Sequence, residues 1–99
     1  FLIMRDRRMT LLEVKEVAHD FRLPHENLGL GQIGRMRAWA SAGAQSDVLI
    51  YHRTTKLWRT ASIQWFYENY RRVNEAGKAV GSWDLREFPT MTLDEYFGG

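Results

Sequence analysis

The chain has 99 residues, of which 44% are hydrophobic and 26% charged, and it carries a formal net charge of +2. This length suits one domain, and this composition argues against disorder of the whole chain. No apolar run approaches the roughly 18 residues of a membrane-spanning helix, no secretory signal pattern is visible, and the lack of cysteine excludes disulfides and thiolate metal sites. We therefore expect a cytoplasmic protein that does not contact a membrane.

Charge is distributed unevenly along the chain. Residues 1–81 carry 13 Lys and Arg against 8 Asp and Glu, whereas residues 82–99 carry 1 against 4. Arg outnumbers Lys by 11 to 3, and guanidinium groups favour bidentate contacts with phosphates and carboxylates. We divide the chain into an N-terminal extension, 1–9, and a single globular domain, 10–99, that ends in an acidic aromatic tail, 82–99.

Residues 10–21 carry the pattern of an amphipathic helix. The run Thr10-Leu11-Leu12-Glu13 has the form of a capping box. Apolar residues then recur at helical spacing, at Leu11, Val14, Ala18 and Phe21. The polar residues would face away from this stripe, namely Glu13, Lys15, Glu16 and Asp20. The sequence thus predicts a helix that begins at Thr10 and ends at Pro24.

A second helix and a strand are expected next. Residues 24–31 predict a loop, and residues 31–42 predict a helix that Gly43 is placed to end. Its apolar face would be formed by Ile33, Met36, Trp39 and Ala40. Residues 47–53 alternate in the manner of a β-strand, and residues 54–56 suit a turn. Residues 57–61 fit either a second hairpin strand or the start of a helix, and both remain open.

The last predicted elements complete the expected fold. From Ile63 the spacing predicts a third helix with Gly77 as its C-cap and with an inward face of Ile63, Phe66, Tyr67, Tyr70 and Val73. Residues 78–83 predict a turn, and Thr92-Leu93-Asp94-Glu95 predicts a short capped helix in a docked tail. The expected fold class is α+β, a small single domain with about three main helices and one short β-hairpin, in the order helix, helix, hairpin, helix, with an ordered C-terminal tail.

Motifs for catalysis, metals and cofactors are weak. The glycines of Gly29-Leu30-Gly31-Gln32-Ile33-Gly34 match a dinucleotide-binding spacing, but no hydrophobic strand precedes them. An anion-accepting helix start that includes Arg35 and Arg37 is the looser interpretation. The histidines, His19, His25 and His52, show no metal-ligand spacing, and no nucleophile, base and orienting group form a set. We predict no cofactor, no metal site and no catalytic residue, and thus no enzyme.

Aromatic and cationic residues alternate between Tyr51 and Arg72, which is typical of protein hot spots and of surfaces that bind single-stranded nucleic acid. The first hypothesis is a non-catalytic binding protein, such as an inhibitor, adaptor or small complex subunit. It would contact a protein partner through Trp58, Arg59, Trp65 and Arg72.

The alternative is a nucleic-acid-binding protein of winged-helix-like outline, such as a transcriptional or replication regulator. Residues 31–42 would then be the recognition helix and residues 53–59 the wing. The contacts would come from Arg35, Arg37, Arg53, Lys56 and Arg59. The protein-binding hypothesis is favoured slightly, because a surplus of five positive charges in residues 1–81 is modest for a phosphate-binding protein.

Overall fold

A computed structural model describes residues 1–5 and 7–98, so that residue 6 of the expected extension and residue 99 of the expected tail lie outside the described residues. The main sheet has four strands in the order β1-β2-β4-β5, and a second sheet pairs β3 with β6. The strands are β1 (Leu2–Arg5), β2 (Arg8–Val17), β3 (Arg22–Pro24), β4 (Gln45–His52), β5 (Leu57–Ser62) and β6 (Ser82–Asp84). The α-helices are α1 (Leu30–Ser41), α2 (Ile63–Glu68) and α3 (Leu93–Tyr96), and a 3-10 turn spans His25–Asn27.

The expected order of helix, helix, hairpin and helix is wrong, because residues 10–17 belong to β2. This strand pairs with β1 on one edge and with β4 on the other. Leu11 packs against the core on one face of the sheet, whereas Leu12 is buried in a cluster on the opposite face. A helix would have aligned the apolar residues on one side. Pairing to a strand 35 positions away and burial of both faces outweigh the local helical spacing.

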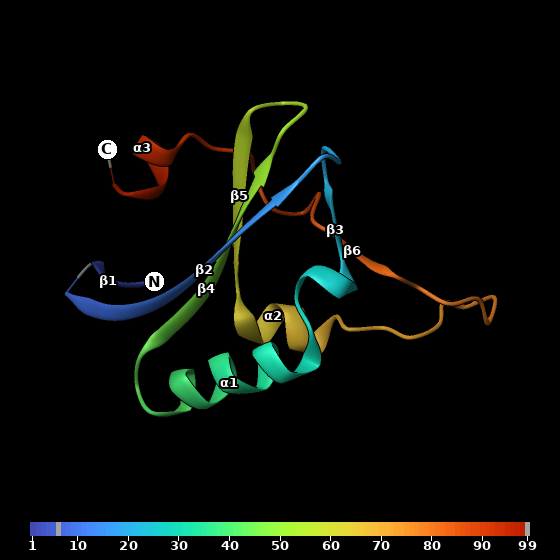
Figure 1. The fold of residues 1–99 in the computed structure, drawn as a ribbon, viewed down its shortest axis with the longest axis horizontal. Coiled ribbons are helices and arrows are strands. Elements are labelled where there is room, and N and C mark those ends of the chain that lie inside the picture. Colours follow the sequence, from blue (N-terminus) through green and yellow to red (C-terminus); the bar gives the residue numbers. More distant parts are fainter. Residues whose placement is uncertain (6, 99) are drawn as a thin grey trace.

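The unit formed by β2, α1 and β4 organises the domain (Figure 1). β2 and β4 are parallel, with a register that runs from Thr10 opposite Gln45 to Val17 opposite His52. Because α1 connects two parallel strands, it must run back along the sheet. The N-terminal end of α1 therefore lies toward the C-terminal end of β2, and its C-terminal end lies toward Leu11.

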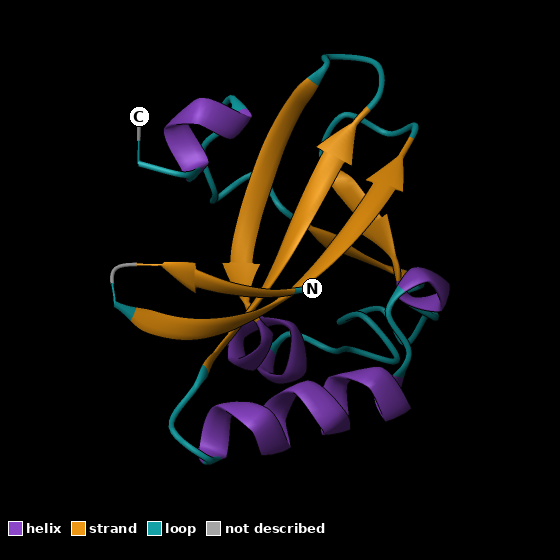
Figure 2. Cartoon of the chain, turned by 60° about the vertical axis from the view of Figure 1, so that its left-hand side comes forward, coloured by secondary structure: helices purple, strands orange, loops and turns teal. Residues whose placement is uncertain are grey.

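Two hydrophobic clusters cover the two faces of the main sheet. The larger joins the sheet to α1 and α2 and includes Ile33, Met36, Val48, Ile50 and Phe66. The smaller, on the opposite face, consists of Leu12, Leu49 and Tyr96, with Ile3, Trp58 and Met91 packed around it. Figure 2 shows α1 and α2 together and α3 apart from them. The sheet is thus thickly covered on the α1 side and covered by the short α3 segment on the other.

The middle of the chain follows the local predictions more closely. α1 occupies the expected second helix, and Gly43 adopts a φ of 99° after it, as its predicted role requires. The strand predicted over residues 47–53 is confirmed as β4. Residues 57–61, which the sequence left open, form β5, so the hairpin is real.

The third helix is shorter than predicted. α2 ends at Glu68, where Asn69 donates its side-chain amide to the carbonyl of Trp65 at 2.9 Å. Ile63 and Phe66 are buried as expected, but the predicted inward face is wrong at Tyr67, which is 45% exposed within α2, and at Val73, which is 58% exposed beyond its end. The capping box predicted at Thr92 is present, whereas the one predicted at Thr10 is not, since Thr10 is buried in β2.

The structure also removes the winged-helix outline, since no helix precedes α1 among the described residues apart from a single 3-10 turn. Within residues 1–5 and 7–98, no helix is long and apolar enough to span a bilayer.

The C-terminal tail docks on the domain itself. Trp83, Leu85 and Tyr96 are buried, whereas Phe97 remains 56% exposed.

Candidate functional site

The four residues predicted to bind a protein partner do not share one face. Trp58 packs in the smaller cluster and contacts the ring of Tyr51, whereas Trp65 packs against the larger cluster on the other side of the sheet. The indole of Trp65 donates a hydrogen bond to Glu87 at 2.8 Å. Arg72 is exposed and follows α2. The two tryptophans are each half-buried, and much of their surface is used inside the chain.

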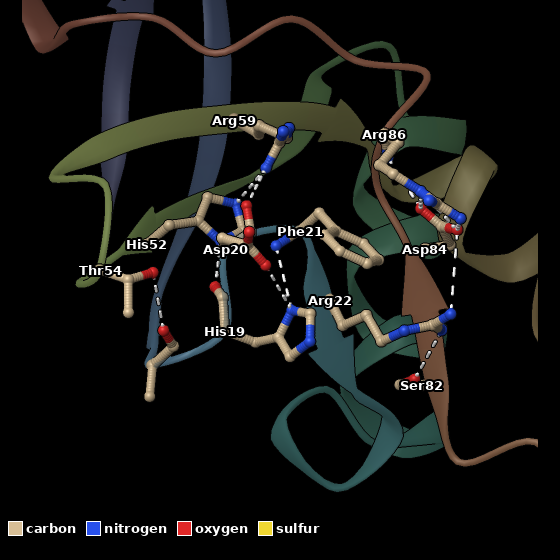
Figure 3. A network of polar contacts seen from close by, with 11 residues as sticks. His19, Asp20, Phe21, Arg22, His52, Thr54, Arg59, Ser82, Asp84 and Arg86 are labelled. Atoms are coloured by element: carbon tan, nitrogen blue, oxygen red, sulfur yellow. Dashed lines mark hydrogen bonds and ion pairs between the residues drawn. The ribbon is translucent and has the colours of Figure 1, made fainter.

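Arg59 forms the centre of an intrachain polar network (Figure 3). Its guanidinium donates to the carbonyls of Asp20 and Phe88 and to Nε2 of His52, the last at 3.2 Å. His52 is fully buried, and its Nδ1 donates to the carbonyl of His19 at 2.7 Å. These two partners fix the neutral tautomer with its proton on Nδ1. Arg59 therefore ties β5 to the segments that follow β2 and β6.

This network makes stability depend on pH. The pKa of His52 is below its ordinary value, chiefly because burial disfavours the charged ring, and the charge of Arg59 acts in the same direction. The carbonyl of His19 and the charge of Asp20 oppose this shift. Because the unfolded chain binds the proton more readily, the contribution of neutral His52 is complete above a pH of about 6.5 and is lost as the pH falls below it.

We expect the thermal midpoint to fall between pH 7 and pH 5, and to fall less steeply in His52→Gln, which cannot titrate. His25 also has a pKa lowered by burial, so some acid sensitivity should persist in the variant. Circular dichroism melts of both proteins at each pH provide the measurement. Equal slopes for the two proteins would contradict this role of His52.

The residues predicted to bind nucleic acid are also dispersed. Arg35 and Arg37 lie on α1, and the guanidinium of Arg37 stacks 3.5 Å from the ring centroid of Tyr67 and contacts Gln64. Arg53 and Lys56 are exposed in the turn between β4 and β5, which Figure 1 shows at the opposite end of the sheet from α1. Of this set, Arg35 lines the same groove as Glu13, a charged residue of β2 that forms an ion pair on the sheet.

That ion pair is formed by two charged side chains on the α1-facing side of β2. Glu13 and Lys15 lie between Leu11 and Val17, which both pack in the larger cluster, and side chains two positions apart share a face of a strand. The Nζ atom of Lys15 lies 3.3 Å from Oε1 of Glu13, and the two side chains are 22% and 31% exposed. A carboxylate and an ammonium group therefore lie on the α1-facing side of β2, on the part of the strand that extends beyond its pairing with β1.

Glu13 opens into a groove of about 310 Å³ between β2 and α1. From α1 the groove receives Gln32, Arg35, Met36 and Trp39, and from β1 and β2 it receives Leu2 and Leu11. A Cβ added at Gly31 would lie 3.6 Å from Nη1 of Arg35, so this guanidinium lies back over the first turn of the helix. We call the groove site the three polar groups that line the groove, Glu13, Gln32 and Arg35, together with Lys15, which is paired with Glu13 beside it.

The sequence pattern did not identify Glu13 and Lys15, because a helix over residues 10–21 turns both away from the core. The available signal was that Glu13 and Lys15 lie two positions apart, in a run that also contains the apolar residues Leu12, Val14 and Val17. In a strand this spacing places both charges on one face, whereas on a helix residues two apart do not face each other. The groove site thus depends on the same residues that overturn the predicted helix.

A larger cleft of about 640 Å³ lies elsewhere, between the second sheet and the segment that follows α2. Its charged lining is mixed, with Arg22, Arg71, Glu75, Asp84 and Glu87. Arg86 binds Asp84 through both carboxylate oxygens and holds the pKa of that carboxyl at about 2. Among the described residues, no three or more His, Cys, Asp or Glu side chains gather as a metal site.

Comparison with known proteins found no matching protein-family model, no matching curated protein and no matching solved structure.

Proposed function

We propose that the chain binds nucleic acid at the groove site and hydrolyses a phosphodiester bond there. The observation that carries this proposal is the half-buried Glu13 and Lys15 pair on the α1-facing side of β2. Glu13 lines the groove together with Gln32 and Arg35, and a concave surface on which a few polar groups converge is where ligand sites usually occur.

Lys15 and Arg35 supply the attraction for phosphate. Arg35 forms no ion pair within the described part of the chain, so its guanidinium is available to a phosphate's two free oxygens. Lys15 provides a second positive charge one side chain away from Glu13. Positive charge fixed where a phosphoryl group gains negative charge lowers the barrier to its hydrolysis.

Glu13 and the side-chain amide oxygen of Gln32 are suitable ligands for a divalent cation. Mg²⁺ prefers oxygen ligands and is commonly held by one or two carboxylates together with substrate phosphates and water, so a site with one carboxylate fits this chemistry. The cation, when bound, would polarise the phosphoryl oxygens. In the hydrolysis proposed here, a water oxygen would bond to phosphorus, the bond from phosphorus to one sugar oxygen would break, and that oxygen would gain a proton as the water lost one.

Incubation of the purified chain with labelled DNA and RNA oligonucleotides at low salt tests this function. We expect shortened products with Mg²⁺ and none with a chelator. Binding without cleavage would contradict the hydrolytic proposal and support the nucleic-acid-binding alternative of the sequence analysis. Absence of binding even at low salt would contradict both of these and leave the protein-binding hypothesis standing.

Protein binding is a second proposal, supported by Trp65 at the larger cleft. This half-buried ring lines the cleft beside Arg22 and Arg71, and tryptophan and arginine are enriched in binding hot spots. The partner would be a cytoplasmic protein, in keeping with a chain that lacks cysteine. A pull-down from nuclease-treated extract should then lose a stoichiometric partner with Trp65→Ala, and an unchanged partner would contradict this role.

A further inference from the structure

The groove changes character along its length. Glu13, Gln32 and Arg35 form a polar end, and Leu2, Leu11, Met36 and Trp39 form an apolar end. The antiparallel course of α1 relative to β2 explains this order, since Gln32 lies in the first turn of the helix and Trp39 in the last. Trp39 is 39% exposed and Leu2 is 55% exposed, so the apolar end presents ring and aliphatic surface to solvent.

Of the four α1 side chains that line this groove, Gln32, Arg35 and Trp39 follow one another at spacings of three and four, and therefore lie in line on one face of the helix. The line places a guanidinium one turn from an indole. A nucleotide has the two parts that these groups recognise, a phosphate and a flat base. Arginine beside an exposed aromatic ring is the combination with which proteins hold the backbone and stack the bases of single strands.

We infer that the substrate is a nucleic acid with an unstacked base, which lies against Trp39 while its phosphate occupies the groove site. This inference rests on the proposed function and names its substrate class. In an intact duplex the bases are stacked on one another, and the face that Trp39 needs is covered. Single strands and duplexes with an unpaired, looped-out base offer that face, so the chain discriminates by base accessibility rather than by sequence.

Binding of fluorescent oligonucleotides to the full chain, with Ca²⁺ in place of Mg²⁺ to suppress cleavage, tests the inference. The probes are a single strand, the matching perfect duplex, and that duplex with one bulged base. We expect Trp39→Ala to weaken binding of the single strand and of the bulged duplex by about ten- to a hundredfold, with Trp39→Phe restoring most of it. Binding of the perfect duplex should be weak and unchanged in both variants.

Leu30→Ala is the matched control, because Leu30 is 45% exposed on α1 but does not line the groove. It should bind all three probes as the native chain does. Equal affinity of Trp39→Ala and the native chain for the single strand, or an equal loss on the perfect duplex, would overturn the inference. If cleavage still depended on Glu13 in that case, the proposed function would stand; if no probe bound at all, the proposed function would fail with it.

Discussion

Glu13→Gln should reduce the rate of phosphodiester cleavage by about a hundredfold or more, because a bound cation stabilises transition-state charge by several kcal/mol and the variant would hold it poorly. The substitution keeps the size of the side chain but removes the negative charge that would hold the cation. It also leaves Lys15 without its partner at 3.3 Å, so affinity for nucleic acid should be maintained or increased. Single-turnover cleavage and equilibrium binding, measured on the same oligonucleotide, separate the two effects.

Glu16→Gln is the control for this experiment. Glu16 lies on the same strand three positions away, is exposed, and by strand alternation points to the sheet face opposite Glu13. The Glu16→Gln substitution removes one negative charge from the same strand, at a position that does not line the groove. The account predicts native cleavage for Glu16→Gln, and an equal loss in the two variants would indicate that only the net charge of the chain matters.

Trp83→Ala should destabilise the fold by about 3–5 kcal/mol, the range for losing a large buried aromatic side chain. Trp83 is 2% exposed, and its ring packs against Phe66, Tyr70 and His25. Its indole also donates a hydrogen bond to the carbonyl of Phe66 at 3.0 Å, at the centre of α2. Since small domains have a total stability of about 5–15 kcal/mol, this loss would bring the chain near unfolding.

Urea denaturation followed by circular dichroism measures this effect. Trp83→Phe keeps a ring but loses the indole donor, and should cost less than the alanine variant. Trp65→Ala is a second reference, because Trp65 is only half-buried and the cost should again be smaller. A loss below about 1 kcal/mol for Trp83→Ala would contradict the placement of β6 and Trp83 in the core.

The elements that the sequence predicted well are those that local signals determine. α1 ends before a glycine with positive φ, β4 is rich in β-branched and aromatic residues, and the short helix after Thr92 has both halves of a capping box. Each of these signals lies within a few residues of the element that it defines. A short stretch of sequence is therefore enough to recognise each of them.

β2 could not be predicted from local spacing, because its pairing partners lie elsewhere in the chain. Leu11 and Leu12 together satisfy either a helix stripe or a strand buried on both faces, and only the contact with β4 separates the two. The error carried over to the candidate site. With a helix in place of β2, Glu13 and Lys15 are ordinary solvent-facing charges, and the aromatic stretch near Trp58 and Trp65 becomes the strongest remaining pattern.

We propose above all that nucleic acid binds in the groove between β2 and α1. Titration of the ¹⁵N-labelled chain with a short single strand in Ca²⁺, followed by amide chemical shifts, tests it most directly. The account predicts that the largest changes occur at Glu13, Lys15, Gln32 and Arg35, with Trp39 at the edge of the affected surface. Changes confined to the larger cleft around Trp65 and Arg71, or to the turn of Arg53 and Lys56, would contradict it.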